Sequence, residues 1–430
     1  MGELILYAAK DFFAPFLSPV KPTRRQTPAA RFVSAPGLTF CREYCTFLSW
    51  STVPPAAVPK KLNMPKKNTI TPMLFFLTAA IAPAYAQPAE FLLPSHPLIR
   101  YTGRFDKRSP KNCRFDWPGN IIELRFGGAS CAVKIRGDGG YYNIYVDGKK
   151  SVMMFDTLER VHALADNLAA DAAHDLRIVK RFEGLKEQVA EIKGFYIDSG
   201  STLHQLPEEK SFPYRMEFIG GSNLLGFGVE AESVTCDTPA AYSDTHLSFG
   251  AVAARGLGAD YRIVAMSGKG LTRNYNSPFY SAPRPFGLYY GRTVKNDSLP
   301  KWDFRAWVPD VVVTSFGVND FSTRPHPPKE LFIARYRAFI QDIRARNPNT
   351  LVVCVSSTKE PLRTYVSELV DEQAAEGNPK IIFYSFAQTP KRMCGCDWHP
   401  NAEAQAKIGM ELAEIIRPLI ADNFNRKNHQ

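Results

Sequence analysis

The 430-residue sequence lacks clustered metal ligands, a long apolar run and an internal repeat. It contains eight cysteines and eight histidines, but nothing with the Cys-x-x-Cys and histidine spacing that zinc sites prefer, so we expect no metal. The apolar stretch 73–84 is much shorter than the roughly 20 residues needed to span a bilayer. These absences argue against a zinc domain, a membrane-spanning protein and a repeat protein.

Acidic residues are scarce only near the N-terminus. The net charge is +11, but the first 67 residues hold ten basic against three acidic side chains, which is +7 and leaves +4 for the rest. Such a mildly basic body gives little support for a nucleic-acid partner, and we expect none. The hydrophobic fraction of 45% is sufficient for real cores and excludes global disorder.

Residues 64–86 have the layout of a secretory signal peptide. A basic start is followed by the apolar stretch 73–84 and by Ala84-Tyr85-Ala86, whose small residues fit a cleavage site. An uncleaved anchor or a buried helix is the alternative. We expect cleavage after Ala86, a periplasmic or secreted protein, and no stable membrane insertion after cleavage. Residues 1–63 are then a non-structured extension or a gene-start artefact.

Six cysteines follow the predicted cleavage site, and an exported protein can keep disulfides. Cys113 and Cys131 are the natural local pair. Cys236 could pair with either cysteine of the segment 394–396 if the two loops meet. Cys354 lies in a buried-strand pattern and is expected to be a free core thiol.

The sequence pattern changes near residue 207, from short alternating strands to apolar runs separated by helical patterns. From 88 to 205, short runs alternate apolar and polar residues and end at Asp-Gly or Gly-Gly turns, which predicts antiparallel hairpins of a β-sandwich. From 210 to 424, apolar runs alternate with helical patterns, which predicts a parallel sheet with crossover helices in an α/β domain. The apolar runs fall at 216–219, 262–266, 311–316, 351–355 and 381–384.

Several residues that follow predicted strands supply the groups that acyl transfer needs. Ser222, after two glycines, offers a hydroxyl at a strand-to-helix turn, Asn319 offers an amide donor, and His399 offers a base. Gly268 could donate its backbone N–H. Because ligands bind beyond the carboxyl ends of parallel strands, we expect these groups to meet. The first hypothesis is therefore a serine esterase.

Two histidines compete for the role of base. His399 has Asp397 beside it to orient the ring, and His246 follows Asp244 in a similar way. We favour His399, because it follows the last predicted strand and so lies at the same sheet edge as Ser222.

At these positions the chain resembles the SGNH hydrolase superfamily and, more narrowly, the family 2 carbohydrate esterases. The resemblance covers nearly all of the chain after the signal peptide, and its joint match is specific. It rests on segments 99–105, 115–119, 217–228, 267–275, 317–320 and 396–400.

The resemblance implies a jelly-roll β-sandwich ahead of a three-layer α/β/α hydrolase domain, and removal of acetyl groups from glucomannan or xylan. By position it implies Ser222 as nucleophile, His399 as base and then acid, and an oxyanion hole of Gly268, Asn319 and the Ser222 backbone. No metal or organic cofactor is implied, and we expect a monomer acting on an acetylated polysaccharide or oligosaccharide.

A second group of residues is expected on the substrate side of the site. Trp398 could stack on a sugar ring, or it could be a core residue that anchors its loop. The polar candidates, which could instead be solvated surface groups, are Lys269, Arg273, Asn274 and Tyr275.

Two departures from the superfamily pattern matter. Gly221 stands where an Asp that helps to shape the turn is usual. The orienting acid usually lies three residues before the histidine, where this chain has Cys396, so either Asp397 or a backbone carbonyl could orient His399. Alternative functions are deacetylation of an envelope polysaccharide or exopolysaccharide, and non-catalytic carbohydrate binding. The joint presence of the serine, asparagine and histidine argues against the binding-only alternative.

Overall fold

The computed structural model describes residues 89–208, 211–280, 285–378 and 380–427. The predicted extension 1–63 and signal peptide 64–86 lie outside these residues. Within the described ranges, no helix is both long and apolar enough to cross a membrane.

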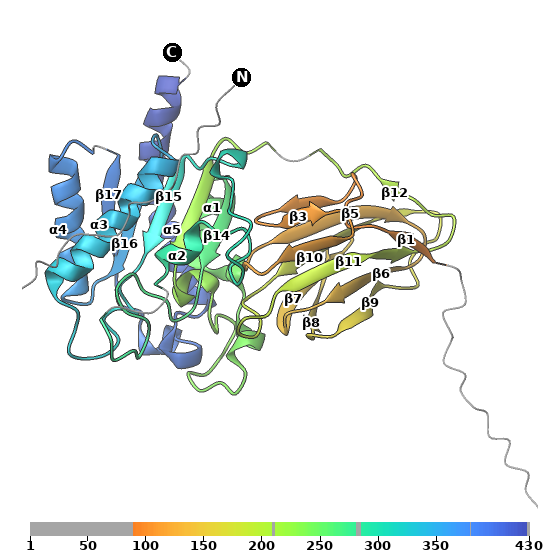
Figure 1. Cartoon of the computed structure of the whole chain (residues 1–430), viewed down its shortest axis with the longest axis horizontal. Helices are drawn as coiled ribbons and strands as arrows, with labels where there is room; N and C mark the ends of the chain where they lie inside the picture. Colours follow the sequence, from red (N-terminus) through yellow and green to blue (C-terminus); the bar gives the residue numbers. More distant parts are fainter. Residues whose placement is uncertain (1–88, 209–210, 281–284, 379, 428–430) are drawn as a thin grey trace, which may run out of the picture. The chain divides into compact units, whose positions relative to one another are not determined.

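Between residues 90 and 204 the described chain forms short strands that assemble into two antiparallel sheets (Figure 1). The strands are β1 (Glu90–Leu92), β2 (Arg100–Thr102), β3 (Asp106–Ser109), β4 (Asn112–Phe115), β5 (Ile121–Gly127), β6 (Cys131–Arg136), β7 (Gly140–Val146), β8 (Lys149–Phe155), β9 (Glu159–Ala165), β10 (Ala173–Lys180), β11 (Ala190–Ile197) and β12 (Leu203–His204). One sheet has the order β3-β4-β11-β6-β9, with β1 also paired to β11. The other has the order β12-β5-β10-β7-β8, with β2 also paired to β5.

The alternating sequence pattern explains how these sheets pack. In β5, Ile122, Leu124 and Phe126 are buried, and the residues between them are partly exposed. Side chains at alternate positions point to one face, so this pattern gives the strand one apolar face. Buried residues of both sheets, including Ile122 of β5 and Ile192 of β11, form a single apolar cluster.

A five-stranded parallel sheet follows, and each strand coincides with one of the apolar runs predicted from the sequence. The strands are β13 (Arg215–Gly220), β14 (Asp260–Ala265), β15 (Val311–Ser315), β16 (Leu351–Ser357) and β17 (Ile381–Phe386). Their order is β14-β13-β15-β16-β17. β13 therefore lies between β14 and β15, and the loops that follow these three strands start side by side.

Helices cover this sheet, and alternate strand residues pack against different helices. The helices are α1 (Phe249–Gly256), α2 (Gly287–Tyr290), α3 (Lys329–Arg346), α4 (Leu362–Ala375) and α5 (Ala402–Lys427). Met216 and Phe218 of β13 share an apolar cluster with residues of α1 and α5. Ile219 shares a second cluster with residues of α3 and α4. The last helix, α5, buries Leu412 and Ile416 in the first of these clusters.

The predicted disulfide between Cys113 and Cys131 is wrong, because both are free and buried. Cys113 lies on β4 and Cys131 on β6, and β11 lies between these two strands. Strands two places apart are separated by roughly 9–10 Å, which exceeds the Cα separation of about 7 Å that a disulfide tolerates. Cys354, in β16, is buried and free, as predicted.

Buried polar contacts join the β-sheet residues to the α/β part of the chain. The Arg104 guanidinium donates to Glu217 of β13 at 2.9 Å, and both side chains are almost fully buried. The Asp116 carboxylate accepts the backbone N–H groups of Lys295 at 2.6 Å and Asn296 at 2.8 Å. Because buried charges are stable only when they are paired, these contacts restrict how the two parts can separate.

Candidate active site

Ser222 lies just beyond the carboxyl end of β13. Gly220 ends the strand, and Ser222 opens a short 3-10 turn, Ser222–Leu225. A Cβ at Gly220 would lie 2.5 Å from the Ser315 carbonyl oxygen at the end of β15, so only glycine permits this close approach. The local sequence thus places the Ser222 hydroxyl at the sheet edge.

His399 contacts Ser222 although 177 residues separate them in the chain. Ser222 Oγ lies 2.8 Å from His399 Nε2. The other ring nitrogen, Nδ1, lies 3.1 Å from the Cys396 carbonyl oxygen. A carbonyl can only accept, so we assign the proton to Nδ1, which leaves Nε2 to accept from the serine hydroxyl. This is the geometry that a general base needs.

The base loop, residues 394–399, is held in a backbone conformation that ordinary residues rarely adopt. Asp397 and Trp398 have φ angles of 48° and 62°, in the left-handed region. Such conformations persist where the surrounding structure fixes them. Here Cys396 is joined to Cys236 by a disulfide, which is one of the two pairings left open by the sequence.

Burial lowers the pKa of His399, while the Cys396 carbonyl and the Asp397 backbone and charge act in the opposite direction. The Phe227 ring lies against the imidazole, with 4.4 Å between ring centroids. A lowered pKa keeps the imidazole neutral at neutral pH, which is the state that can take a proton.

The sequence left open whether Asp397 or a backbone carbonyl orients the base, and the geometry favours the carbonyl. Asp397 is exposed, and Nδ1 of His399 is engaged by the Cys396 carbonyl instead. The chain places its acid only two residues before the histidine, and the carbonyl of the residue before that acid takes the orienting position. Asp397 acts on the ring through its backbone and its charge, both of which raise the pKa of His399.

Asn319 lies beside the nucleophile, on the loop that follows β15. Its Nδ2 donates to the Lys269 carbonyl at 2.8 Å. A Cβ built at Gly221 would lie 3.0 Å from the same Nδ2 atom. The missing side chain at Gly221 therefore leaves room for the Asn319 amide next to Ser222. Gly268, on the loop after β14, has a φ of 69°, a conformation that favours glycine.

Asp320 is a buried acid beside the candidate site that sequence reasoning left without a role. Its buried carboxylate accepts backbone N–H groups of Thr272 at 2.6 Å and of Arg273 at 3.0 Å. A third, longer bond comes from Leu271 at 3.3 Å. Asp320 thus ties the loop of Gly268 to the loop of Asn319. The signal available in the sequence was an acid directly after the candidate amide donor.

Arg273 does not have the substrate-side position that we expected. Its side chain is buried, donating from Nε to the Asp320 carbonyl at 3.0 Å and from Nη1 to the Pro325 carbonyl at 2.9 Å. An Arg side chain is buried only when its donors are satisfied, and here backbone carbonyls satisfy them. Arg273 therefore supports the loop.

The other substrate-side candidates have varied exposure. Tyr275 is 60% exposed and Trp398 is 57% exposed, so Trp398 is not a core residue. Lys269 and Asn274 are half-buried, and the Lys269 ammonium lies 5.2 Å from the centre of the Tyr289 ring. Two exposed aromatic side chains thus lie on the loops that carry Gly268 and His399.

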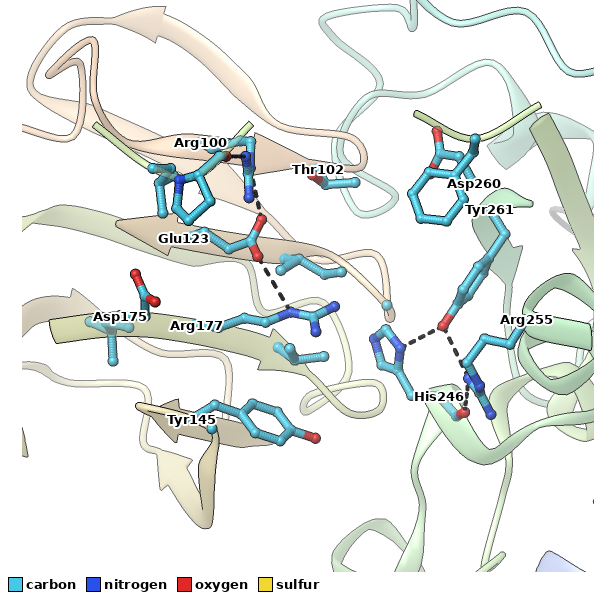
Figure 2. A pocket seen from close by; sticks show the side chains of 18 of the residues that line it. Arg100, Thr102, Glu123, Tyr145, Asp175, Arg177, His246, Arg255, Asp260 and Tyr261 are labelled. Atoms are coloured by element: carbon cyan, nitrogen blue, oxygen red, sulfur yellow. Dashed lines mark hydrogen bonds and ion pairs between the residues drawn. The ribbon is translucent and has the colours of Figure 1, made fainter. Parts of the chain in front are cut away.

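His246, the rival base, lies in a different part of the molecule. It lines a groove of about 930 Å³ whose lining includes neither Ser222 nor His399 (Figure 2). Its Nδ1 is bonded to the Tyr261 hydroxyl at 2.7 Å, and burial lowers the pKa of His246 to about 4. His246 is therefore not placed to act on Ser222.

The groups around Ser222 define what the site can do. A hydroxyl hydrogen-bonded to a neutral imidazole can become a nucleophile, and amide N–H groups beside it can donate hydrogen bonds to a developing oxyanion. In the part of the chain that the structure describes, no three His, Cys, Asp or Glu residues gather as metal ligands. The chemistry that this geometry fits is acyl transfer.

Two family descriptions match the chain. "Carbohydrate esterase 2 N-terminal" matches residues 101–207, and "GDSL-like Lipase/Acylhydrolase family" matches residues 218–407. Through the second match the chain carries a GDSL-like, or SGNH, hydrolase domain. Within that class it is a homologue of the family 2 carbohydrate esterases, which confirms the resemblance found in the sequence.

Individual relatives agree with this placement. The chain is 31% identical over 338 residues to "Cellulase/esterase CelE" of Acetivibrio thermocellus, covering 75% of this chain and 39% of that protein. It is 27% identical to an "Acetylxylan esterase / glucomannan deacetylase" of Cellvibrio japonicus, and the match covers 74% of this chain and 89% of that protein. A family two carbohydrate esterase from Clostridium thermocellum, solved in complex with cellohexaose, superposes on this chain with a TM-score of 0.67 at 29% identity. The superposition covers 75% of this chain and 99% of that protein.

Proposed function

We propose that the protein is a carbohydrate esterase that removes O-acetyl groups from polysaccharides of the glucomannan or xylan type. The observation that carries the proposal is the 2.8 Å contact between Ser222 Oγ and His399 Nε2 at the edge of a parallel sheet. Relatives named as acetylxylan esterases and glucomannan deacetylases support the choice of substrate.

In the first half-reaction, Ser222 Oγ attacks the acetyl carbonyl carbon while its proton passes to His399 Nε2. The oxyanion that forms accepts hydrogen bonds from the Gly268 and Ser222 backbone N–H groups and from Asn319. The Asn319 amide has two N–H bonds and donates one to Lys269, so one remains for the oxyanion. Collapse breaks the ester bond, and His399 returns its proton to the sugar oxygen.

The second half-reaction releases acetate from the acetyl-Ser222 intermediate. Water attacks the acetyl carbonyl, and its proton passes to His399 Nε2. The serine oxygen then leaves and takes that proton back, which restores the free enzyme. The Cys396 carbonyl holds the imidazole in the same tautomer through both steps, because it can accept only from a protonated Nδ1.

The same proposal covers the finer fold and the location. The two antiparallel sheets around one core are proposed to form the jelly-roll, and the parallel sheet with α3 and α4 on one face and α1 and α5 on the other is proposed to form three layers. The Cys236–Cys396 disulfide supports export to the periplasm or beyond, where disulfides persist.

Exposed aromatic rings support a sugar chain as the substrate. Tyr275 and Trp398 present planar faces on which the C–H groups of a sugar ring can pack, and both lie on loops that carry groups of the site. A related esterase was solved with cellohexaose, which is consistent with a site open to an extended chain.

Acetate release from acetylated glucomannan and acetylated xylan tests the proposal. We expect release by the purified protein, and at least about a 10³-fold loss in Ser222→Ala. Ser151→Ala, an exposed serine on β8, is the matched control and should retain full activity. Equal release by the Ser222→Ala and unmodified proteins would overturn the proposed nucleophile, and no release from either polysaccharide would overturn the proposed substrate class.

A further inference from the structure

We propose that Phe182 and Glu183, which follow β10 in the antiparallel-sheet domain, are positioning residues for the active site of the α/β domain. Glu183 holds the turn that carries Gly268, and Phe182 holds the ring that lies against His399. The inference deepens the proposed function and rests on it, because it assigns a role to residues that touch neither substrate nor reacting atoms.

Glu183 accepts a hydrogen bond from the backbone N–H of Ser267, the residue before Gly268. Its Oε2 accepts the Ser267 N–H at 2.9 Å, and its Oε1 accepts from Lys295 Nζ at 3.0 Å. The Lys295 backbone is itself fixed, because its N–H donates to Asp116 at 2.6 Å. The Ser267 N–H lies in the peptide plane between Met266 and Ser267. This hydrogen bond thus fixes the peptide directly before the one that carries the Gly268 N–H, whose direction then depends only on the φ and ψ of Ser267.

The charge of this carboxylate is compensated locally. A carboxylate close to a developing oxyanion would repel it in a partly buried site. The Glu183 and Lys295 side chains are only 14% and 6% exposed, and they form a direct ion pair. Although burial lowers it, the pKa of Lys295 is raised by Glu183 and Asp116, so the ammonium remains charged. Glu183 can therefore orient the turn without opposing the reaction.

Phe182 supports the other half of the site. Its ring packs edge-on against Phe227 with 5.7 Å between centroids, and Phe227 lies 4.4 Å from His399 by the same measure. Phe182 is almost fully buried, and the adjacent Arg181 is anchored by a bond from Nε to the Ser243 carbonyl at 3.1 Å. Phe182 thus backs the ring that excludes water from the imidazole.

These contacts come from a part of the chain whose local sequence carries no sign of them. Phe182 and Glu183 lie just after β10 of the antiparallel-sheet domain, far in sequence from Gly268 and His399. The antiparallel-sheet domain therefore completes the active site and is more than an attached module.

The first test compares Glu183→Ala with a matched control, using steady-state hydrolysis of 4-nitrophenyl acetate. Glu191→Ala is the control, because Glu191 is 12% exposed and paired with Arg136 and Lys193 but contacts no active-site loop. We expect Glu183→Ala to lower kcat by about 10- to 100-fold with KM changed less than about threefold. Glu183→Gln keeps an acceptor for Ser267 and should recover most of the loss.

The pH dependence of kcat/KM distinguishes the role of Phe182 from that of Glu183. Phe182→Ala lets water reach His399, so the pKa of His399 should rise toward its ordinary value and the acid limb of kcat/KM should move to higher pH. Glu183→Ala should leave that limb in place, because Glu183 acts on the oxyanion side. A loss of kcat in Glu183→Ala no larger than in Glu191→Ala, or an unmoved acid limb in Phe182→Ala, would overturn the respective role.

Amide hydrogen exchange distinguishes failure of this inference from failure of the proposed function. In Glu183→Ala, exchange at the Ser267 N–H should accelerate at least about tenfold relative to Glu191→Ala, whatever the protein hydrolyses. If the unmodified protein cleaves no acetyl ester but the exchange accelerates, the proposed function fails and the positioning by Glu183 stands. If exchange is unchanged in a folded Glu183→Ala protein, the positioning is refuted, and Glu183→Gln, which keeps an acceptor for Ser267, should exchange nearly as slowly as the unmodified protein.

Discussion

The proposed oxyanion side and the proposed base side of the candidate active site are held by different kinds of bonds. On the oxyanion side, the Asp320 carboxylate accepts backbone N–H groups from the segment 271–273. On the base side, the Cys236–Cys396 disulfide fixes the loop whose carbonyl orients His399. Besides the contacts of Glu183 and Phe182, the first loop is thus tied by several hydrogen bonds to one buried side chain, and the second is tied by one covalent link.

The largest effect is expected from Asp320→Ala. The change leaves up to three buried N–H groups without an acceptor, at about 1–3 kcal/mol each, so the free energy of unfolding should fall by at least about 3 kcal/mol. Activity should fall by about 10³-fold, because the oxyanion donors lose their alignment. Urea unfolding and acetate release measure the two effects.

Asp320→Asn sharpens this comparison, because it keeps one acceptor oxygen. Its stability should lie between those of the Asp320→Ala and unmodified proteins. If Asp320→Ala were as stable and as active as the unmodified protein, the buried carboxylate would not be what holds the oxyanion side.

A smaller effect is expected from Cys236→Ser. The disulfide joins residues 160 apart in sequence, and breaking such a link typically costs about 2–5 kcal/mol. Loss of the link should also loosen the base loop and lower kcat by about 10- to 100-fold. Thermal unfolding and esterase kinetics, each with and without a reducing agent, measure these changes.

Cys394→Ser is the matched control for the disulfide, because Cys394 is free, half-buried and on the same loop. It should leave kcat and stability unchanged. A reducing agent that lowers the activity of the unmodified protein but not that of Cys236→Ser would attribute the loss to this bond. Unchanged kinetics in Cys236→Ser would mean that hydrogen bonds alone hold the base.

The smallest effect is expected from Asp397→Asn. The exposed carboxylate does not orient His399, so kcat should fall less than about threefold, against about 10⁴-fold where a buried acid orients the base. Because the Asp397 charge raises the pKa of His399, its removal should shift the acid limb of kcat/KM to lower pH. A pH–rate profile beside the exposed Asp303→Asn control checks both; a large loss of kcat would restore Asp397 as the orienting acid.

The sequence predicted the strands of the parallel sheet, because an apolar run is a local signal. It also predicted that Ser222 meets His399, because groups that follow parallel strands gather at the carboxyl ends of those strands. It did not predict that Cys113 and Cys131 are kept apart, because strand order is a long-range property. It also misplaced Arg273, because its backbone partners come from another loop.

The order of the groups along the chain has a consequence for biosynthesis. Ser222 is made 177 residues before His399, which at about 5–20 residues per second is a delay of roughly 10–35 s on the ribosome. During that interval the serine hydroxyl has no imidazole to take its proton. The incomplete chain therefore has no activated serine. Ester cleavage begins only after the loop that carries His399 has been made and has folded against Ser222.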